Sequence, residues 1–91
     1  MIFDELKTGF RVDLGGAQKY FNVIPDIAVF AKGLSNGYPI SALTGKRHLM
    51  EQFEDEACFL SASYATEKAS LNAAIKTLDI LMSEKVIDHI W

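Results

Sequence analysis

The sequence predicts an α/β fold in which helices flank a mixed, mostly parallel sheet. Two short apolar runs, at residues 2–4 and 27–31, have the length and composition of buried strands. Apolar residues recur at helical spacing over a longer segment toward the C-terminal end. Asp4 ends the first run and Lys32 follows the second, and the two lie far enough apart for a crossover connection, so we expect the strands to be parallel neighbours.

The segments around these strands are predicted from turn residues. Glycines punctuate residues 6–16, which predicts a loop, and residues 17–21 are expected to form a short helical turn. Pro25 and Asp26 introduce the second strand. After turn residues at 36–39, a third strand is predicted over residues 40–43, and Gly45 should end it.

The second half of the chain is predicted to be helical. Residues 46–53 are expected to form a helix with Leu49, Met50 and Phe53 facing inward. Thr66 is a candidate N-cap for the next helix, with Glu67 in its first turn, and this helix should run to about residue 82. We expect it to bury a stripe formed by Leu71, Ile75, Leu78 and Leu81 or Met82. Ser83 and Glu84 then restart a helix.

Composition excludes several classes of function. The net charge of −3 gives no basis for binding nucleic acid or an anionic membrane. His48 and His89 have no partners at ligand spacing, so no metal site is predicted. Cys58 is the single cysteine, which favours a reducing compartment and a cytoplasmic protein. The hydrophobic share of 49% is high for a chain of 91 residues and fits a piece of a larger core.

Asp4 and Lys32 are the candidate catalytic residues. Ligands in open α/β sheets gather at the carboxyl ends of the strands, where both side chains are expected. An amine and a carboxylate at neighbouring strand ends suit pyridoxal 5'-phosphate (PLP): the amine forms a Schiff base and the acid keeps the pyridine nitrogen protonated. The alternative is that Asp4 and Lys32 form a structural ion pair in a non-catalytic α/β remnant, and spacing alone leaves both open.

Several motifs in order resemble the class III PLP-dependent aminotransferases, and in particular their glutamate-1-semialdehyde aminomutase-like branch. The run FDELKTGFR at residues 3–11 is similar to the family signature FDEV-x-TGFR. LGGAQ at residues 14–18, AKG at residues 31–33 and GYPI at residues 37–40 continue the match. The resemblance covers essentially the whole chain, but only a middle portion of such an enzyme.

The resemblance implies a function and a set of site residues. Lys32 takes the position of the Schiff-base lysine and Asp4 that of the acid at the ring nitrogen. Ser63 takes the position of a threonine that reaches the phosphate of the neighbouring subunit's cofactor, which implies a homodimer. Ala65 and Thr66 replace two family glycines, which changes the backbone conformations available there. The implied reaction is amino-group transfer, by transamination or within one molecule, between a small-molecule amino donor and a carbonyl acceptor.

The resemblance also implies how the chain is organised. Residues 1–91 correspond to part of the large, PLP-binding domain of a fold-type-I enzyme. The family's upstream phosphate loop and aromatic stacking residue, and its C-terminal small domain, have no counterpart in this sequence. We therefore expect the isolated chain to be inactive, and the activity to belong to the full-length protein.

Overall fold

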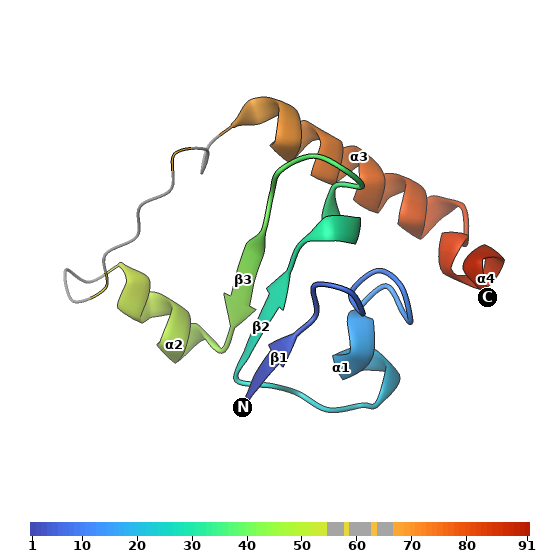
Figure 1. Cartoon of the computed structure of the whole chain (residues 1–91). Helices are drawn as coiled ribbons and strands as arrows, with labels where there is room; N and C mark the ends of the chain where they lie inside the picture. Colours follow the sequence, from blue (N-terminus) through green and yellow to red (C-terminus); the bar gives the residue numbers. More distant parts are fainter. Residues whose placement is uncertain (55–57, 59–62, 64–66) are drawn as a thin grey trace.

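A three-stranded sheet with helices beside it forms the centre of the molecule (Figure 1). The structure is a computed structural model, and it describes residues 1–54, 58, 63 and 67–91. Its elements in chain order are β1 (Ile2–Asp4), α1 (Gly16–Tyr20), β2 (Ile27–Phe30), the 3-10 turn η1 (Lys32–Leu34), β3 (Ala42–Gly45), α2 (Arg47–Met50), the 3-10 turn η2 (Glu51–Phe53), α3 (Lys68–Ser83) and α4 (Val86–Ile90).

The sheet confirms the predicted α/β fold and the parallel pairing of the first two strands. β1 pairs with β2 in parallel, with Asp4 opposite Val29, and β2 pairs with β3 in the antiparallel direction. The third strand begins two residues later than predicted, at Ala42. The reason is that the preceding turn is longer: the hydroxyl of Ser35 donates to the carbonyl of Tyr38 at 2.6 Å, and the amide of Ile40 donates to the same carbonyl at 3.0 Å.

The long helix α3 lies across the sheet's upper end and contacts η1 (Figure 1). Its covered face differs from the predicted stripe. Ser70 and Ala74 are buried, whereas Leu71 and Ile75 are exposed. Small side chains allow the helix backbone to approach η1 closely, so Leu71 and Ile75 point away there. Leu78 and Leu81, further along the predicted stripe, are half-buried.

The ends of the helices also differ from the prediction. Glu67 is the N-cap of α3, and its carboxylate accepts hydrogen bonds from the amides of Ala69 and Ser70, each at 2.7 Å. The nearby Ser70 side chain and, after it, the amides of Ser70 and Ala69 hold the pKa of Glu67 below its ordinary value. The predicted cap, Thr66, lies outside the described residues. The helix expected over residues 46–53 is a short α-helix followed by a 3-10 turn, with Leu49, Met50 and Phe53 less exposed than their neighbours, as predicted.

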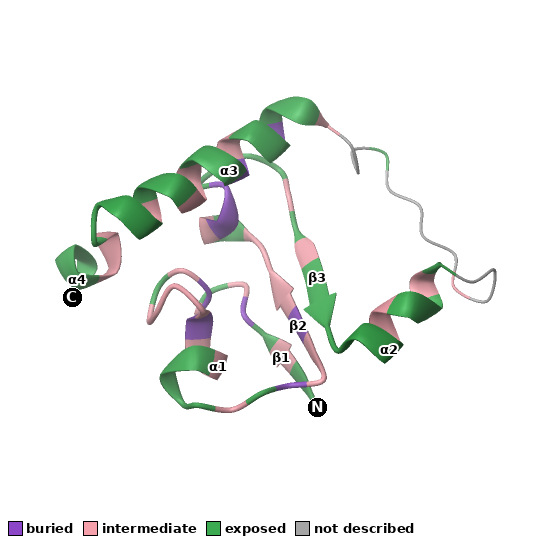
Figure 2. Cartoon of the chain, turned by 180° about the vertical axis from the view of Figure 1, so that it is seen from behind, coloured by how far each residue is buried: buried purple, intermediate pink, exposed green. Residues whose placement is uncertain are grey.

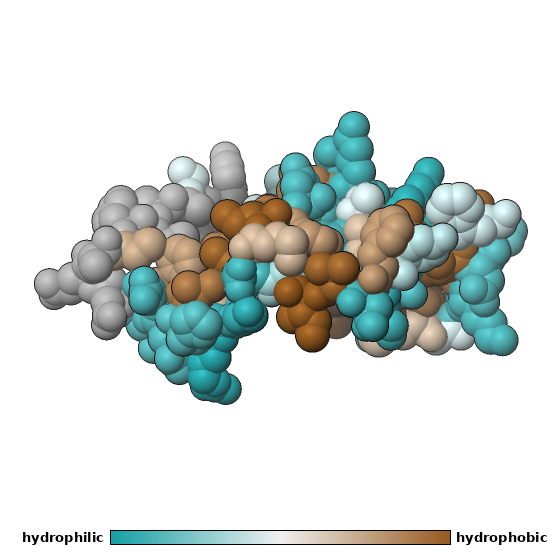
Figure 3. Space-filling model, turned by 90° about the horizontal axis from the view of Figure 1, so that it is seen from below, coloured by the Kyte–Doolittle hydropathy of each residue, from teal (hydrophilic) through white to brown (hydrophobic). Residues whose placement is uncertain are grey.

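Few of the described apolar side chains are buried. Buried residues occur in β2, η1 and α3 and also around the loop after β1 and the start of α1 (Figure 2), and the buried hydrophobic residues are Ala28, Leu34 and Ala74. Large apolar side chains such as Phe21 (68% exposed) and Ile24 (82% exposed) reach solvent instead. Apolar surface is visible from below, between polar regions (Figure 3). No helix in the described part of the chain combines the length and hydropathy needed to cross a bilayer.

Candidate functional site

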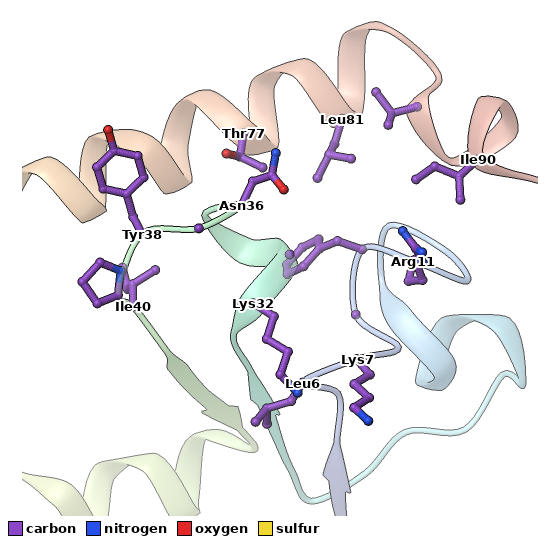
Figure 4. Close-up of a pocket in the computed structure, with 16 residues that line it drawn as sticks. Leu6, Lys7, Arg11, Lys32, Asn36, Tyr38, Ile40, Thr77, Leu81 and Ile90 are labelled. Atoms are coloured by element: carbon purple, nitrogen blue, oxygen red, sulfur yellow. The ribbon is translucent and has the colours of Figure 1, made fainter.

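A cleft of about 1030 Å³ opens between the loops at the sheet's carboxyl edge and the helices α3 and α4 (Figure 4). The loop after β1 lines one side with Leu6, Lys7 and Arg11, and the turn after β2 contributes Lys32. Thr77 and Leu81 of α3 line the opposite side. The volume is at the upper end of the range for small-molecule sites, and the position at the carboxyl ends of parallel strands is where such sites form.

Lys32 is the predicted site residue that the structure places on this cleft. β2 ends at Phe30, one residue earlier than predicted, and Lys32 begins the turn η1 two residues beyond the strand. Its side chain extends toward Leu6 in Figure 4 and is exposed. Across the described residues, no ion pair or side-chain hydrogen bond involves its amine. A primary amine on a cleft wall without a carboxylate partner is suited to covalent attachment of a carbonyl compound.

The backbone at Lys32 is left-handed, with φ of 48°. Two further residues on the cleft share this conformation, Phe10 with φ of 61° and Asn36 with φ of 50°. Asparagine adopts it with little strain, but for lysine and phenylalanine it is uncommon and costs about 1–2 kcal/mol each. Phe10 is held in place by packing against Phe30, with 5.6 Å between ring centroids. Strained positions of this kind cluster at ligand sites.

Asp4 lies at the end of β1, beside β2, as the sequence predicts. One carboxylate oxygen, Oδ1, accepts a hydrogen bond from the amide of Leu6 at 3.0 Å, which fixes the start of the loop that lines the cleft. Asp4 itself is exposed and is not among the residues that line the cleft. No ion pair joins Asp4 to Lys32 within the part of the chain that the structure describes, so the structural ion pair expected in the alternative is not formed there.

Ser63 is an exposed turn residue. It is described without its immediate neighbours, and it is not among the residues that line the cleft. Its predicted role toward a neighbouring subunit stays a prediction, and the substitutions at Ala65 and Thr66 fall outside the described residues.

A buried carboxylate that sequence reasoning missed holds the cleft loop in shape. Glu5 is fully buried, and its oxygens accept hydrogen bonds from the Thr8 hydroxyl and from the amides of Ala17 and Gln18, the last two at 2.8 Å. Burial raises the pKa of Glu5, but the Thr8 hydroxyl and the two amides outweigh that effect and hold the pKa below its ordinary value. The carboxylate therefore stays ionised and ties the loop to the start of α1.

The one sign of a special role for Glu5 in the sequence is its position directly after Asp4, and this position does not distinguish a buried carboxylate from a solvated one. Two adjacent acids at a strand end are ordinarily solvated, and nothing in the spacing marks one as buried.

An ion pair lies at the other end of the sheet, away from the cleft, where the amine of Lys46 is 2.7 Å from the carboxylate of Asp26. The Lys46 hydrogen bond and, after it, the Met1 amine lower the pKa of Asp26 to about 2. Among the described residues, no group of three potential ligands is arranged for a metal ion.

Comparison with known proteins identifies the family of this chain. The family model "Aminotransferase class-III" matches residues 1–91. A 3-aminobutyryl-CoA aminotransferase from Cloacimonas acidaminovorans is 46% identical, over 97% of this chain and 21% of that protein. A glutamate-1-semialdehyde 2,1-aminomutase from Methanocaldococcus jannaschii is 48% identical, over 86% of this chain and 18% of that protein.

Solved structures show the same relationship in three dimensions. The FumI protein of Sphingopyxis sp. MTA144, in its PLP internal aldimine form, superimposes with a TM-score of 0.87 at 30% identity, over 96% of this chain and 20% of that one. The chain thus spans about a fifth of the length of the relatives it matches. With its whole length matched by the family model and its fold shared with solved transaminases, the chain belongs to the class-III aminotransferase family.

Proposed function

We propose that this chain is part of the large domain of a PLP-dependent aminotransferase or aminomutase, and that Lys32 is the residue that binds the cofactor covalently. One observation carries the proposal: the Lys32 amine lines a ligand-sized cleft at the carboxyl edge of a parallel strand pair, without an acidic partner. Family membership supports it, because the proteins of this family that the comparisons name transfer amino groups.

The residues present fit the cofactor. The Lys32 amine is accessible, and the cleft has room for a phosphorylated pyridine together with a small substrate. When bound, PLP withdraws electrons from the carbon that carries the substrate's amino group. Lys32 would supply the attaching amine, and the same amine would serve as a base that moves a proton at that carbon.

Asp4 is proposed to keep the cofactor's ring nitrogen protonated. Its support is its place at the end of the strand next to β2 and the family resemblance, because it is not part of the cleft lining described above. Its hydrogen bond to the Leu6 amide uses Oδ1 and holds the carboxyl group in one orientation. The choice between transamination and intramolecular transfer would depend on residues beyond this segment, and we propose amino-group transfer in the general sense.

We further propose that the full-length protein is a cytoplasmic homodimer in which Ser63 reaches toward the partner's site. Ser63 is exposed, as a residue in such a contact would have to be in the isolated chain. Sedimentation of the full-length protein checks the dimer. A Ser63→Ala variant that keeps its dimer but binds PLP as tightly as the unchanged protein would contradict the role given to Ser63.

Borohydride reduction of the full-length protein tests the central proposal. Reduction in the presence of PLP, followed by peptide mapping, should place the cofactor on Lys32. Lys32→Ala and Lys32→Arg should both lose this label and turnover, because a guanidinium stays charged and does not attack the aldehyde. Lys76→Ala, on the exposed side of α3, is the matched control and should keep both. A label on Lys7, which lines the same cleft, would overturn the assignment.

A further inference from the structure

We propose that Glu5, a buried residue that does not line the cleft, is a positioning residue for Lys32. Its carboxylate fixes the loop at residues 6–15, this loop packs against the chain on both sides of Lys32, and the packing keeps the Lys32 amine on the cleft. The role of Glu5 toward the cofactor rests on the proposed function, whereas its role toward the Lys32 backbone depends only on contacts within the chain.

Glu5 holds both ends of the loop that follows it. Its amide donates to the carbonyl of Val29 in β2 at 2.9 Å, which joins the start of the loop to the sheet. Its carboxylate accepts the amides of Ala17 and Gln18, each at 2.8 Å, which joins the end of the loop to α1. The Thr8 hydroxyl, inside the loop, donates to the same carboxylate. A single buried residue therefore fixes the start, the interior and the end of this loop.

Gly9 and Phe10 carry the contact between this loop and the chain around Lys32. Gly9 lies so close to Phe30 that a Cβ added at Gly9 would come within 2.6 Å of Phe30 Cδ1. The Phe10 ring also packs against Phe30, with 5.6 Å between ring centroids. On the other side of Lys32, the Cβ position of Gly33 is 3.5 Å from the Gly9 carbonyl oxygen and 3.6 Å from Phe10 Cβ. The loop thus contacts the chain just before and just after Lys32.

The Lys32 backbone needs this support because its left-handed conformation, with φ of 48°, is strained, as is that of Phe10. Such conformations persist only where the surrounding contacts determine them. If Glu5 no longer holds the loop, Phe10 can move away from Phe30 and Gly33. Lys32 can then relax to an ordinary backbone conformation, which turns its side chain in another direction. The placement of the Lys32 amine therefore depends on a carboxylate that it does not contact.

Hydrogen exchange in the full-length apoprotein tests the Lys32 backbone without the cofactor. The amides of Ser35 and Asn36 both donate to the Lys32 carbonyl, at 3.3 and 3.0 Å, so their protection reports whether the turn is formed. Glu5→Gln places an NH₂ group against one of the two helix amides, because these amides bond to different carboxylate oxygens. It should speed the exchange of the two turn amides at least about tenfold, the factor for one lost hydrogen bond to a charged group.

Two further variants separate this effect from a general loss of stability. Asp26→Asn is the matched control, because it removes a carboxylate that is also bonded within the fold, to Lys46 at 2.7 Å, but at the opposite end of the sheet. It should leave the exchange of the turn amides unchanged. Thr8→Val removes one bond to Glu5 and keeps both helix amides paired, so it should speed the exchange by a smaller factor, and it decides the question if Glu5→Gln does not fold. Exchange that is unchanged in both loop variants, or raised equally in Asp26→Asn, would overturn the inference.

Ligand binding to the full-length apoprotein tests the consequence for the amine. PLP is compared with 4-deoxypyridoxine 5'-phosphate, which has a methyl group in place of the aldehyde, so only PLP can form a C=N bond with the Lys32 nitrogen and release water. Glu5→Gln should slow the attachment of PLP, followed by absorbance, at least about tenfold and leave the dissociation constant of the analogue within about twofold. Equal losses for the two ligands would overturn the inference. If the turn amides respond but PLP never attaches to Lys32 in the unchanged protein, the proposed function fails and the role of Glu5 toward the Lys32 backbone stands.

Discussion

The carboxylate of Glu5 lies directly against the backbone of Gly16, so that a Cβ added at Gly16 would come within 2.5 Å of Glu5 Oε2. Gly16 also has a left-handed backbone, with φ of 75°. Position 16 therefore needs glycine for two separate reasons, the conformation and the missing side chain. Together these two residues join the loop at the cleft to α1.

Gly16→Ala should destabilise the full-length protein by about 3 kcal/mol or more, because the left-handed strain adds to a collision with a buried charge. Gly37→Ala is the matched control: Gly37 also has positive φ, at 120°, but nothing lies within 4 Å of its Cβ position. It should cost about 1–3 kcal/mol, from backbone strain alone. Urea unfolding of both variants makes the comparison, and equal losses would show that the contact with Glu5 contributes nothing.

Glu5→Gln should destabilise the protein by about 2–3 kcal/mol at neutral pH, since an amide group cannot accept all three hydrogen bonds. Folding lowers the pKa of Glu5 from 4.5, so the ionised carboxylate contributes its full stability above that pH and loses it as the pH falls through the folded-state pKa. The unchanged protein should therefore lose more stability than Glu5→Gln between about pH 6 and pH 3.

Thermal unfolding across this pH range measures the difference. Glu54→Gln, at an exposed position, is the control and should follow the unchanged protein. Parallel curves for the unchanged protein and Glu5→Gln would mean that Glu5 titrates alike in the folded and unfolded chains.

Asp4→Asn should separate the two roles of Asp4. Asparagine keeps an oxygen for the Leu6 amide, so the loop should keep its shape, but it removes the negative charge. Borohydride labelling of Lys32 should persist while kcat falls roughly 100-fold or more. Asp4→Ala should lose stability as well as activity. Unchanged kcat in Asp4→Asn would remove Asp4 from the catalytic machinery.

The isolated 91-residue chain should associate or fail to fold cooperatively. Its described apolar side chains are largely exposed, among them Ile24, Phe21 and Ile75, and its buried core is small. Light scattering and thermal unfolding at several concentrations test this prediction. A monomer with a cooperative transition independent of concentration would contradict it.

The sequence predicted what depends on local pattern and on strand order. β1 and β2 are parallel neighbours, and Lys32 lies on the cleft at their carboxyl edge, because apolar runs and turn residues encode both. The covered face of α3 was not predictable in this way. Hydrophobic periodicity favours the large residues Leu71 and Ile75, but contact with η1 depends on close approach at Ser70 and Ala74, which has no periodic signal.

The site shows the same division. Residue type and position indicate a reactive amine at Lys32. The burial of Glu5, in contrast, depends on the loop that brings the amides of Ala17 and Gln18 back to its carboxylate. These contacts span 12 and 13 positions, and no short motif specifies them. Asp4 and Lys32 were expected to meet as neighbours at strand ends. No ion pair joins them among the described residues: β2 ends at Phe30, and Lys32 lies two residues beyond the strand in a left-handed turn.

The sparse core has a consequence for synthesis on the ribosome. Among the described residues, the strands lie within residues 2–45, so their backbone pairing can begin once that segment leaves the exit tunnel, before the rest of the chain is made. Its exposed apolar side chains, however, have no packing partners within the described residues and would remain prone to aggregation while translation continues. Slowed elongation just after this segment, for instance through rare codons, should prolong that exposure and increase the demand on chaperones for the nascent polypeptide.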